Sequence, residues 1–220
     1  MNSSIPVIVP ARVAVTAVFG PLDDLNGALG AHAMKEEEML ALFVAGDWSC
    51  AGAGPMHMED LFAGLLAQVP ADKIVCAVVV TGNLDAPAAI LVDRDTDWAP
   101  SLIVGGKLAV HSLCLGGGAT QVVGDLAVQS TIYGKYNHGS LEVGGDTRAD
   151  TILSNDFEMT FHGEVACPHV ISALGHLNIP AHFSGDALGQ ILAPRFLDAD
   201  GDPIDDRILD AVNDGLSLLR

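Results

Sequence analysis

A short phrase centred on glycine returns along the chain and constrains its fold more than any other sequence feature. Each copy has apolar or small residues, a glycine, a polar or charged residue, and then an alternating apolar tail. Four clear copies are Val80–Ala86, Val104–Val110, Val122–Val128 and Val143–Ala149, and a less regular one follows at Phe161–Cys167. Looser copies flank them at Val44–Cys50 and Gly185–Leu188. A phrase that returns at a nearly fixed period is typical of a protein built from stacked structural repeats.

The spacing of the glycines predicts the kind of repeat. From Gly82 to Gly185 successive key glycines are 24, 18, 21, 18 and 22 residues apart. About 20 residues suffice for one coil of a parallel β-helix, in which each rung packs on the next. Glycine suits the corner of a coil, which requires either a positive φ or a close backbone approach. A β-sandwich is the alternative, but its strands would not require the same phrase to return at this period.

We therefore predict a mainly β protein, a right-handed parallel β-helix (solenoid) with a few capping α-helices. The hexapeptide phrase of left-handed acyltransferase helices is absent, which favours the right-handed form. Three regions are expected: an N-terminal cap region at 1–42, the solenoid at 43–197, and a C-terminal capping helix at 198–220.

Two apolar stripes predict the helices. The first predicts an inserted helix near 57–69, because apolar residues recur there at helical spacing until Pro70. The second follows Asp202 and Pro203, which resemble an N-cap and a first helical residue. Its members are Ile208, Leu209, Val212, Leu216 and Leu219. Because solenoid ends expose apolar rungs and strand edges, we expect this second helix to close an end as a lid.

The charge balance points to a basic partner. The chain of 220 residues has 28 acids and 10 bases, a net charge of −18. Such a surface repels phosphate backbones and excludes nucleic acid as an expected partner. The longest apolar run, Ile74–Val80, is too short to cross a bilayer, so no membrane association is expected. Four widely spaced cysteines and the lack of a signal-peptide pattern indicate a reduced, cytoplasmic protein.

No motif of catalytic or metal chemistry emerges. The acidic turn Asp198–Asp202 fails the EF-hand pattern, because Pro203 and Leu209 stand where Gly and Glu are required. The histidines at 162, 169, 176 and 182 are about seven residues apart, too close for one side chain per rung. Acids at 93, 95 and 97 form an alternating run that is typical of a charged rim. The chain is therefore not expected to be an enzyme or to hold a cofactor or metal.

The segment from Ile132 to Leu141 is the most individual one, because it holds both tyrosines of the chain. Tyr133 and Tyr136 precede Asn137 and His138, which suit a tight turn. Tyrosines beside a turn can form a binding epitope, and they can equally plug a solenoid corner by covering the rung below.

These phrases carry a resemblance. The run from Gly82 to Gly163, with its Val-x-Gly-Asp-Leu-x-Val copies, the Ile132–Leu141 segment and Thr151–Asp156, resembles bacterial β-solenoid proteins among the immunity proteins of polymorphic toxin systems. It is more loosely similar to bactofilin-type polymer-forming scaffolds. The resemblance covers about 80 of the 220 residues.

The resemblance implies a non-enzymatic module that binds and occludes a cognate bacterial toxin, with a basic toxin domain as partner. A self-assembling bactofilin-like scaffold is the first alternative, and a β-helix enzyme acting through clustered acids is the second. A monomer or small homo-oligomer is expected. The predicted partner-binding residues are Asp125, Tyr133, Tyr136, Asn137, His138, Glu142, Asp146 and Asp156.

Overall fold

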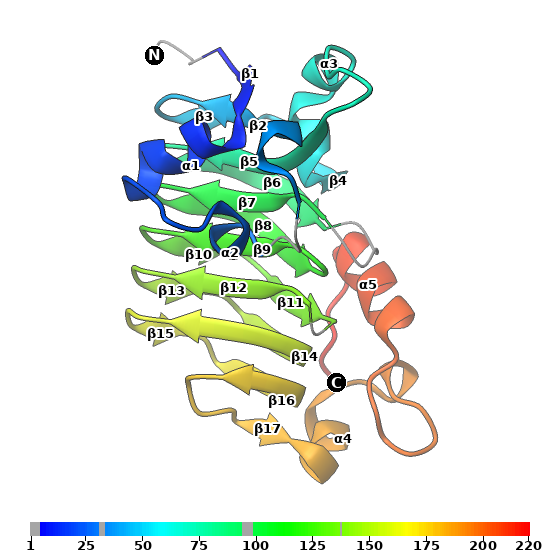
Figure 1. Cartoon of the computed structure of the whole chain (residues 1–220). Helices are drawn as coiled ribbons and strands as arrows, with labels where there is room; N and C mark the ends of the chain where they lie inside the picture. Colours follow the sequence, from blue (N-terminus) through cyan, green and yellow to red (C-terminus); the bar gives the residue numbers. More distant parts are fainter. Residues whose placement is uncertain (1–4, 31–33, 94–98, 137) are drawn as a thin grey trace.

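A stack of β-coils forms the body of the protein. The computed structural model describes residues 5–30, 34–93, 99–136 and 138–220. The protein is mainly β, with 44% strand and 20% helix, and contains a β-solenoid of about 5 turns and a few helices. Figure 1 shows the coils stacked along one axis, with the N-terminal strands at one end and β16 and β17 at the other. The predicted fold class is confirmed, while the right-handed sense of the coil stays a prediction.

Three faces make up each coil, and parallel strands continue each face from rung to rung. Face 1 contains β2 (Met39–Val44), β5 (Ile74–Val80), β7 (Ser101–Val104), β9 (Ala119–Val122), β12 (Ser140–Val143) and the last part of β14 (Thr151–Phe161). Face 2 contains β3 (Trp48–Ser49), the first parts of β6 (Leu84–Val92) and β8 (Leu108–Leu115), β10 (Leu126–Val128), β13 (Thr147–Arg148) and β15 (Val165–Ala166). Face 3 contains β4 (Gly54–His57), the last parts of β6 and β8, β11 (Thr131–Lys135), the first part of β14, the first part of β16 (His169–Leu177) and β17 (Phe183–Ser184).

The register confirms that the glycine phrases stack. The last residue of each face 1 strand pairs with its counterpart in the next rung, in the column Val44, Val80, Val104, Val122, Val143 and Phe161. All six side chains are buried in the central core. Because alternate residues of a strand point to opposite sides, the same strands present a second set of side chains outward.

The phrase glycines form a ladder at the corner between face 1 and face 2. The N–H groups of Gly82, Gly106 and Gly124 each donate to the carbonyl oxygen of the glycine one rung before, at 2.9–3.1 Å. A Cβ on Gly124 would lie 2.7 Å from the carbonyl oxygen of Gly106. Close approach of two backbones is therefore the reason for glycine here. Only Gly46, at the start of the ladder, has a positive φ of 101°.

Most of the uneven repeat length arises at a different corner, between face 3 and face 1, and one or two further residues are added between face 2 and face 3 in the rungs of β6 and of β10 and β11. The longest excess, residues 58–73, separates β4 from β5, and shorter ones separate β6 from β7 and β11 from β12. Where successive glycines are 18 residues apart, this corner is short, as it is between β8 and β9. The corners, chiefly the one between face 3 and face 1, thus absorb the differences in rung length.

The N-terminal region covers the first half of face 1. β1 (Val7–Pro10) pairs antiparallel with β2, and α1 (Ala11–Phe19) and α2 (Leu25–Ala28) follow it. Their apolar side chains pack on outward residues of β2, β5 and β7. A 3-10 helix, η1 (Glu36–Glu38), leads into β2, so the solenoid begins at Met39, slightly before the predicted boundary.

The insertion closes the N-terminal end of the core. The predicted helix near 57–69 is instead a 3-10 helix, η2 (Met58–Phe62), followed by a short α3 (Ala63–Leu66). Met58 and Phe62 are buried in the central core, and the Phe62 ring lies 5.1 Å from that of Trp48. Figure 1 places α3 at the end opposite β17.

The C-terminal region differs most from its predicted role. The solenoid ends at Ser184, and η3 (Gly185–Ala187), α4 (Leu188–Ile191), η4 (Pro194–Phe196) and α5 (Asp205–Asn213) follow. Instead of closing an end as a lid, this segment packs along the outside of face 3 (Figure 1). The reason is that face 3 is apolar on its outer side, with Ile90, Cys114 and Ile171 buried against it. We call residues 185–220 the C-terminal strap.

The second predicted stripe is only partly correct. Ile208 and Val212 of the strap are buried against the outer side of face 3. However, α5 ends at Asn213, and Leu216 is exposed. The helix begins after Ile204 rather than at Asp202, because Pro203 forms an antiparallel bridge with Leu197. Among the described residues no helix has the length and apolar run needed to span a bilayer.

Candidate functional site

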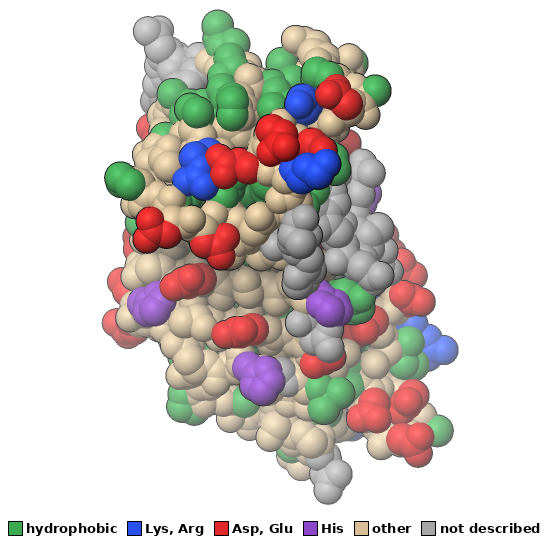
Figure 2. All heavy atoms as spheres, in the orientation of Figure 1, with side chains coloured by type: hydrophobic (Ala, Val, Ile, Leu, Met, Phe, Trp, Pro, Cys, Tyr) green, Lys and Arg blue, Asp and Glu red, His purple; other side chains and the backbone are tan. Residues whose placement is uncertain are grey.

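The covers described above leave face 2 and the second half of face 1 open, with an acidic corner between them. On face 1, α1 and α2 stop short of β12 and β14, so the outward side chains there face solvent. We call this region the open face; its outward residues are Glu142, Glu158, Thr160 and His162, and at its border Gln121 of β9 donates to the carbonyl oxygen of Ala28 in α2. In Figure 2 acidic and histidine side chains lie on this part of the molecule, whereas the Lys and Arg of the same view lie near the N-terminal end and on the C-terminal strap.

A column of polar side chains borders the open face at the corner after the glycine ladder. Its members, one per rung, are Asp47, Asn83, Lys107, Asp125, Asp146 and Glu164. Wherever the side chain can accept, its Oδ1 receives the N–H of the next member. Asp47 accepts from Asn83 at 2.8 Å, Asp125 from Asp146 at 3.0 Å and Asp146 from Glu164 at 2.9 Å. We call this row the corner column.

The corner column fixes a row of negative charge in space. Asp125, Asp146 and Glu164 occupy consecutive rungs, which are about 4.8 Å apart in a parallel sheet. The hydrogen bonds to Asp125 and Asp146 hold their side chains in one direction, while both residues remain exposed. Fixed carboxylates lose little side-chain entropy on binding, so they suit a cationic partner surface better than mobile ones.

Lys107 interrupts the hydrogen-bond row. Its backbone N–H donates to Asn83 Oδ1 at 2.8 Å, but its ammonium group cannot accept a hydrogen bond from the N–H of Asp125. The column is therefore divided into an N-terminal part with one acid and a C-terminal part with three.

A histidine pairs with the central acid of the open face. His162 Nε2 lies 2.9 Å from Glu142 Oε1, and both side chains are about half exposed. Glu158 and His176 are register neighbours on β14 and β16 of the same surface. These pairs add two carboxylates to the three of the corner column.

A shallow hollow lies beside Glu142. It measures about 210 Å³ and is lined by Phe19 of α1 and by Gln121, Val123 and Glu142 of the sheet. Phe19 and Val123 are both exposed hydrophobic residues. The hollow thus joins an apolar contact surface to the acidic one, a combination that is common in protein interfaces.

The prediction that Tyr133 belongs to an exposed contact surface is wrong. Its side chain is fully buried between β11 and the C-terminal strap, and its hydroxyl donates to Asp205 Oδ1. Asn155 Nδ2 donates to the same oxygen at 2.7 Å. Burial, together with the negative charge of Asp205, raises the pKa of Tyr133 far above its usual range. The alternative interpretation of the ring as packing within the solenoid is nearer to the structure.

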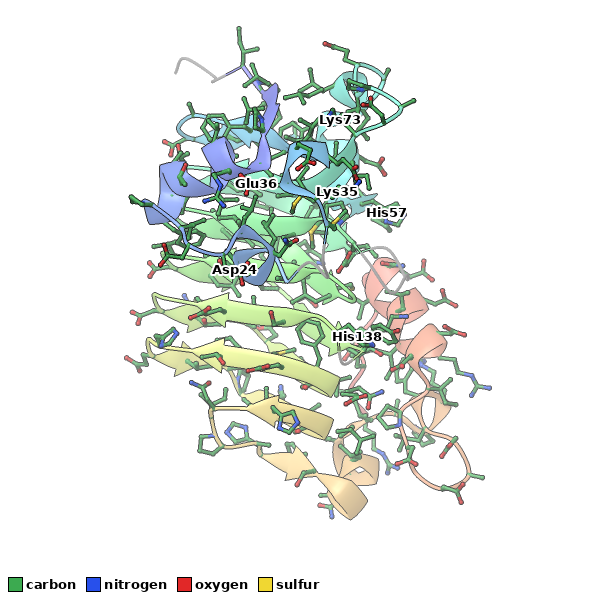
Figure 3. All side chains as sticks on the ribbon, viewed as in Figure 1. Asp24, Lys35, Glu36, His57, Lys73 and His138 are labelled. Atoms are coloured by element: carbon green, nitrogen blue, oxygen red, sulfur yellow. The ribbon has the colours of Figure 1, made fainter. Side chains whose placement is uncertain are left out.

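The other residues of the tyrosine segment lie at the corner between face 3 and face 1. Tyr136 has φ +83° and is partly exposed, and its ring centroid is 5.0 Å from that of His138. His138 is exposed, and Figure 3 labels its side chain. Asp156 is exposed one rung further, with φ +56°. Asn137 lies outside the described residues.

The predicted contact residues therefore separate into two groups. Asp125 and Asp146 belong to the corner column at one border of the open face, and Glu142 lies on its surface. Tyr136, His138 and Asp156 lie at the opposite border, next to the strap. Sequence reasoning missed Glu164 and His162, although the repeat itself places Glu164 at the same phrase position as Asp146.

The acidic and thiol side chains that could have served catalysis or metal binding have structural roles instead. Asp93 accepts from the N–H groups of Gly116 and Gly118, at 3.2 and 2.9 Å, while acids 95 and 97 lie outside the described residues. Asp198 accepts from Asp200 and Asp202, and these backbone bonds hold its pKa below the usual range. The pKa of the thiol of Cys114 is raised to about 12 by burial. In the described parts of the chain, no three His, Cys, Asp or Glu side chains are grouped to hold a metal ion.

Comparison of the chain with protein-family models, with curated proteins and with solved structures finds no match.

Proposed function

We propose that this protein is a non-enzymatic binding module that occludes a basic partner protein through its open face and corner column. Following the sequence resemblance, the partner is a bacterial toxin domain and the protein is its immunity protein. The observation that carries the proposal is the row Asp125, Asp146 and Glu164, three exposed acids on consecutive rungs, of which the first two have carboxylates held by hydrogen bonds from the next rung.

Charge and shape would act in sequence. The net charge of −18 would steer a basic domain toward the protein and speed association. Cationic side chains would then pair with the corner column, while the hollow beside Glu142 takes an apolar side chain. The strand surface is rigid because β12 is hydrogen-bonded to β9 on one side and to β14 on the other, so the bound domain would be blocked sterically rather than by a chemical reaction.

The experiment begins with the product of the gene next to the one that encodes this chain. It is expressed alone and together with this protein, and growth is recorded. We expect growth arrest by the neighbour alone, rescue on co-expression, and a complex whose dissociation constant rises with salt. Normal growth with the neighbour alone, or no complex between the purified proteins, would contradict the immunity role.

Matched variants locate the contact surface. The double substitution Asp125→Asn and Asp146→Asn removes two charges but keeps the side-chain oxygen that accepts each ladder bond. We expect it to fold normally and to weaken the complex about tenfold or more. The control, Asp200→Asn with Asp214→Asn, removes two exposed charges from the C-terminal strap and should leave binding nearly unchanged. If both double variants weakened the complex equally, the partner would be held by the overall negative charge and not by the proposed contact surface.

A further inference from the structure

The last rung of the solenoid has a feature that binding of a basic partner does not explain. From Val165 to Gly185 the chain has 21 consecutive residues without Asp, Glu, Lys or Arg. Charged residues make up 17% of the whole sequence, and no other charge-free run is as long. The run covers β15, β16 and β17, the strands at the C-terminal end of the coil (Figure 1).

The same rung ends in an unpaired strand edge. The last part of β16, Leu174–Leu177, pairs with β14 on one side. On its other side no strand is paired with it among the described residues, since β17 pairs only with Ile171 and Ser172. Leu174 at the start of this edge is 64% exposed. Edge strands with free N–H and C=O groups readily pair with another chain unless charges or covers prevent it.

The opposite end of the solenoid is closed. β1 runs antiparallel along the outer edge of β2, and η2 brings Met58 and Phe62 over the core. The C-terminal strap leaves the edge of β16 uncovered because it packs on face 3. One closed and one open end permit a pair of molecules but not a chain of them.

We propose that the open end of β16 and β17 binds a second copy of this chain, forming a twofold dimer. Twofold symmetry brings two identical edges together antiparallel, so Leu174–Leu177 of one copy would continue the sheet of the other. Charge favours this occupant: two molecules of charge −18 repel each other least where the surfaces that meet carry no charge, and a basic partner has no acidic group of this run to pair with there. The dimer does not depend on the proposed toxin.

The test measures the mass of the full chain in solution by analytical ultracentrifugation. We expect a concentration-dependent species of twice the 22.8 kDa monomer. Leu174→Glu places a charge at the edge and should raise the dissociation constant about tenfold or more. The matched control Leu216→Glu adds the same charge at an exposed leucine of the strap and should leave it unchanged. A monomer at concentrations up to about 100 µM, or filaments, would overturn the proposal.

A second measurement covers the case in which Leu174→Glu fails to fold. Hydrogen exchange of the unaltered chain should slow at Leu174–Leu177 when the protein concentration rises, and no slowing there would also overturn the proposal. Salt separates this contact from the toxin complex. Raising salt from about 50 to about 500 mM should strengthen the dimer by screening its repulsion and weaken binding of a basic partner.

Discussion

At the scale of the residue, the corner glycines explain both the repeat and its strictness. A glycine at each corner lets successive backbones touch and donate hydrogen bonds from rung to rung. Any side chain would intrude on the backbone below, whatever its polarity. The constraint therefore comes from contact between rungs and would vanish in an isolated coil, which is why the phrase marks a stack.

Gly124→Ala should be strongly destabilising. Its Cβ would meet both the carbonyl carbon and oxygen of Gly106, at 2.8 and 2.7 Å, where only backbone could give way. We expect a loss of about 1–3 kcal/mol in the free energy of unfolding, measured by urea denaturation. Gly64→Ala is the control, because nothing lies within 4 Å of the added carbon and the site is helical. A similar loss in both variants would contradict the ladder.

Lys107 offers a test of the corner column. Lys107→Asn supplies the missing acceptor for the N–H of Asp125, whereas Lys107→Ala removes the same charge without supplying one. We expect the Asn variant to be more stable than the Ala variant by about 0.5–1.5 kcal/mol, the usual net value of one hydrogen bond. Thermal and urea unfolding of the two proteins measure the difference, and equal stabilities would argue against side-chain bonds between the rungs.

At the scale of the element, the repeat was predictable and the covers were not. The phrase predicts where the strands lie because every copy places its equivalent positions inward. The column of paired residues from Val44 to Phe161 shows this. An apolar stripe such as Ile208 and Val212 indicates that a helix buries one side, but not against which surface. The surface on which this helix packs is formed by Ile90, Cys114 and Ile171. In the sequence these residues look like core residues, but they lie on the outer side of face 3.

The attachment of the strap depends on a polar contact within that apolar layer. Asp205, at the start of α5, accepts from both Tyr133 and Asn155. A double-mutant cycle of Tyr133→Phe and Asp205→Ala should give a coupling energy of about 1.5–3 kcal/mol, as expected of a hydrogen bond to a charged group. The cycle cancels the effect of Asp205 on the helix terminus. Additive losses in urea denaturation would mean that the contact contributes nothing of its own.

At the scale of the whole molecule, the three covers decide what remains available to a partner. The N-terminal helices occupy half of face 1, the strap occupies face 3 and the insertion closes one end. The candidate site was predictable where it follows the repeat, as Asp125 and Asp146 do. It was not predictable at Tyr133, because burial there depends on a segment about 70 residues away in sequence.

The corner between face 3 and face 1 has a practical consequence. Coils of different length coexist because most surplus residues leave and re-enter the stack there, between the end of one strand and the start of the next. A short foreign peptide, such as an epitope or a fluorophore-labelling sequence, could be grafted between β11 and β12 and displayed there while every rung kept its partners.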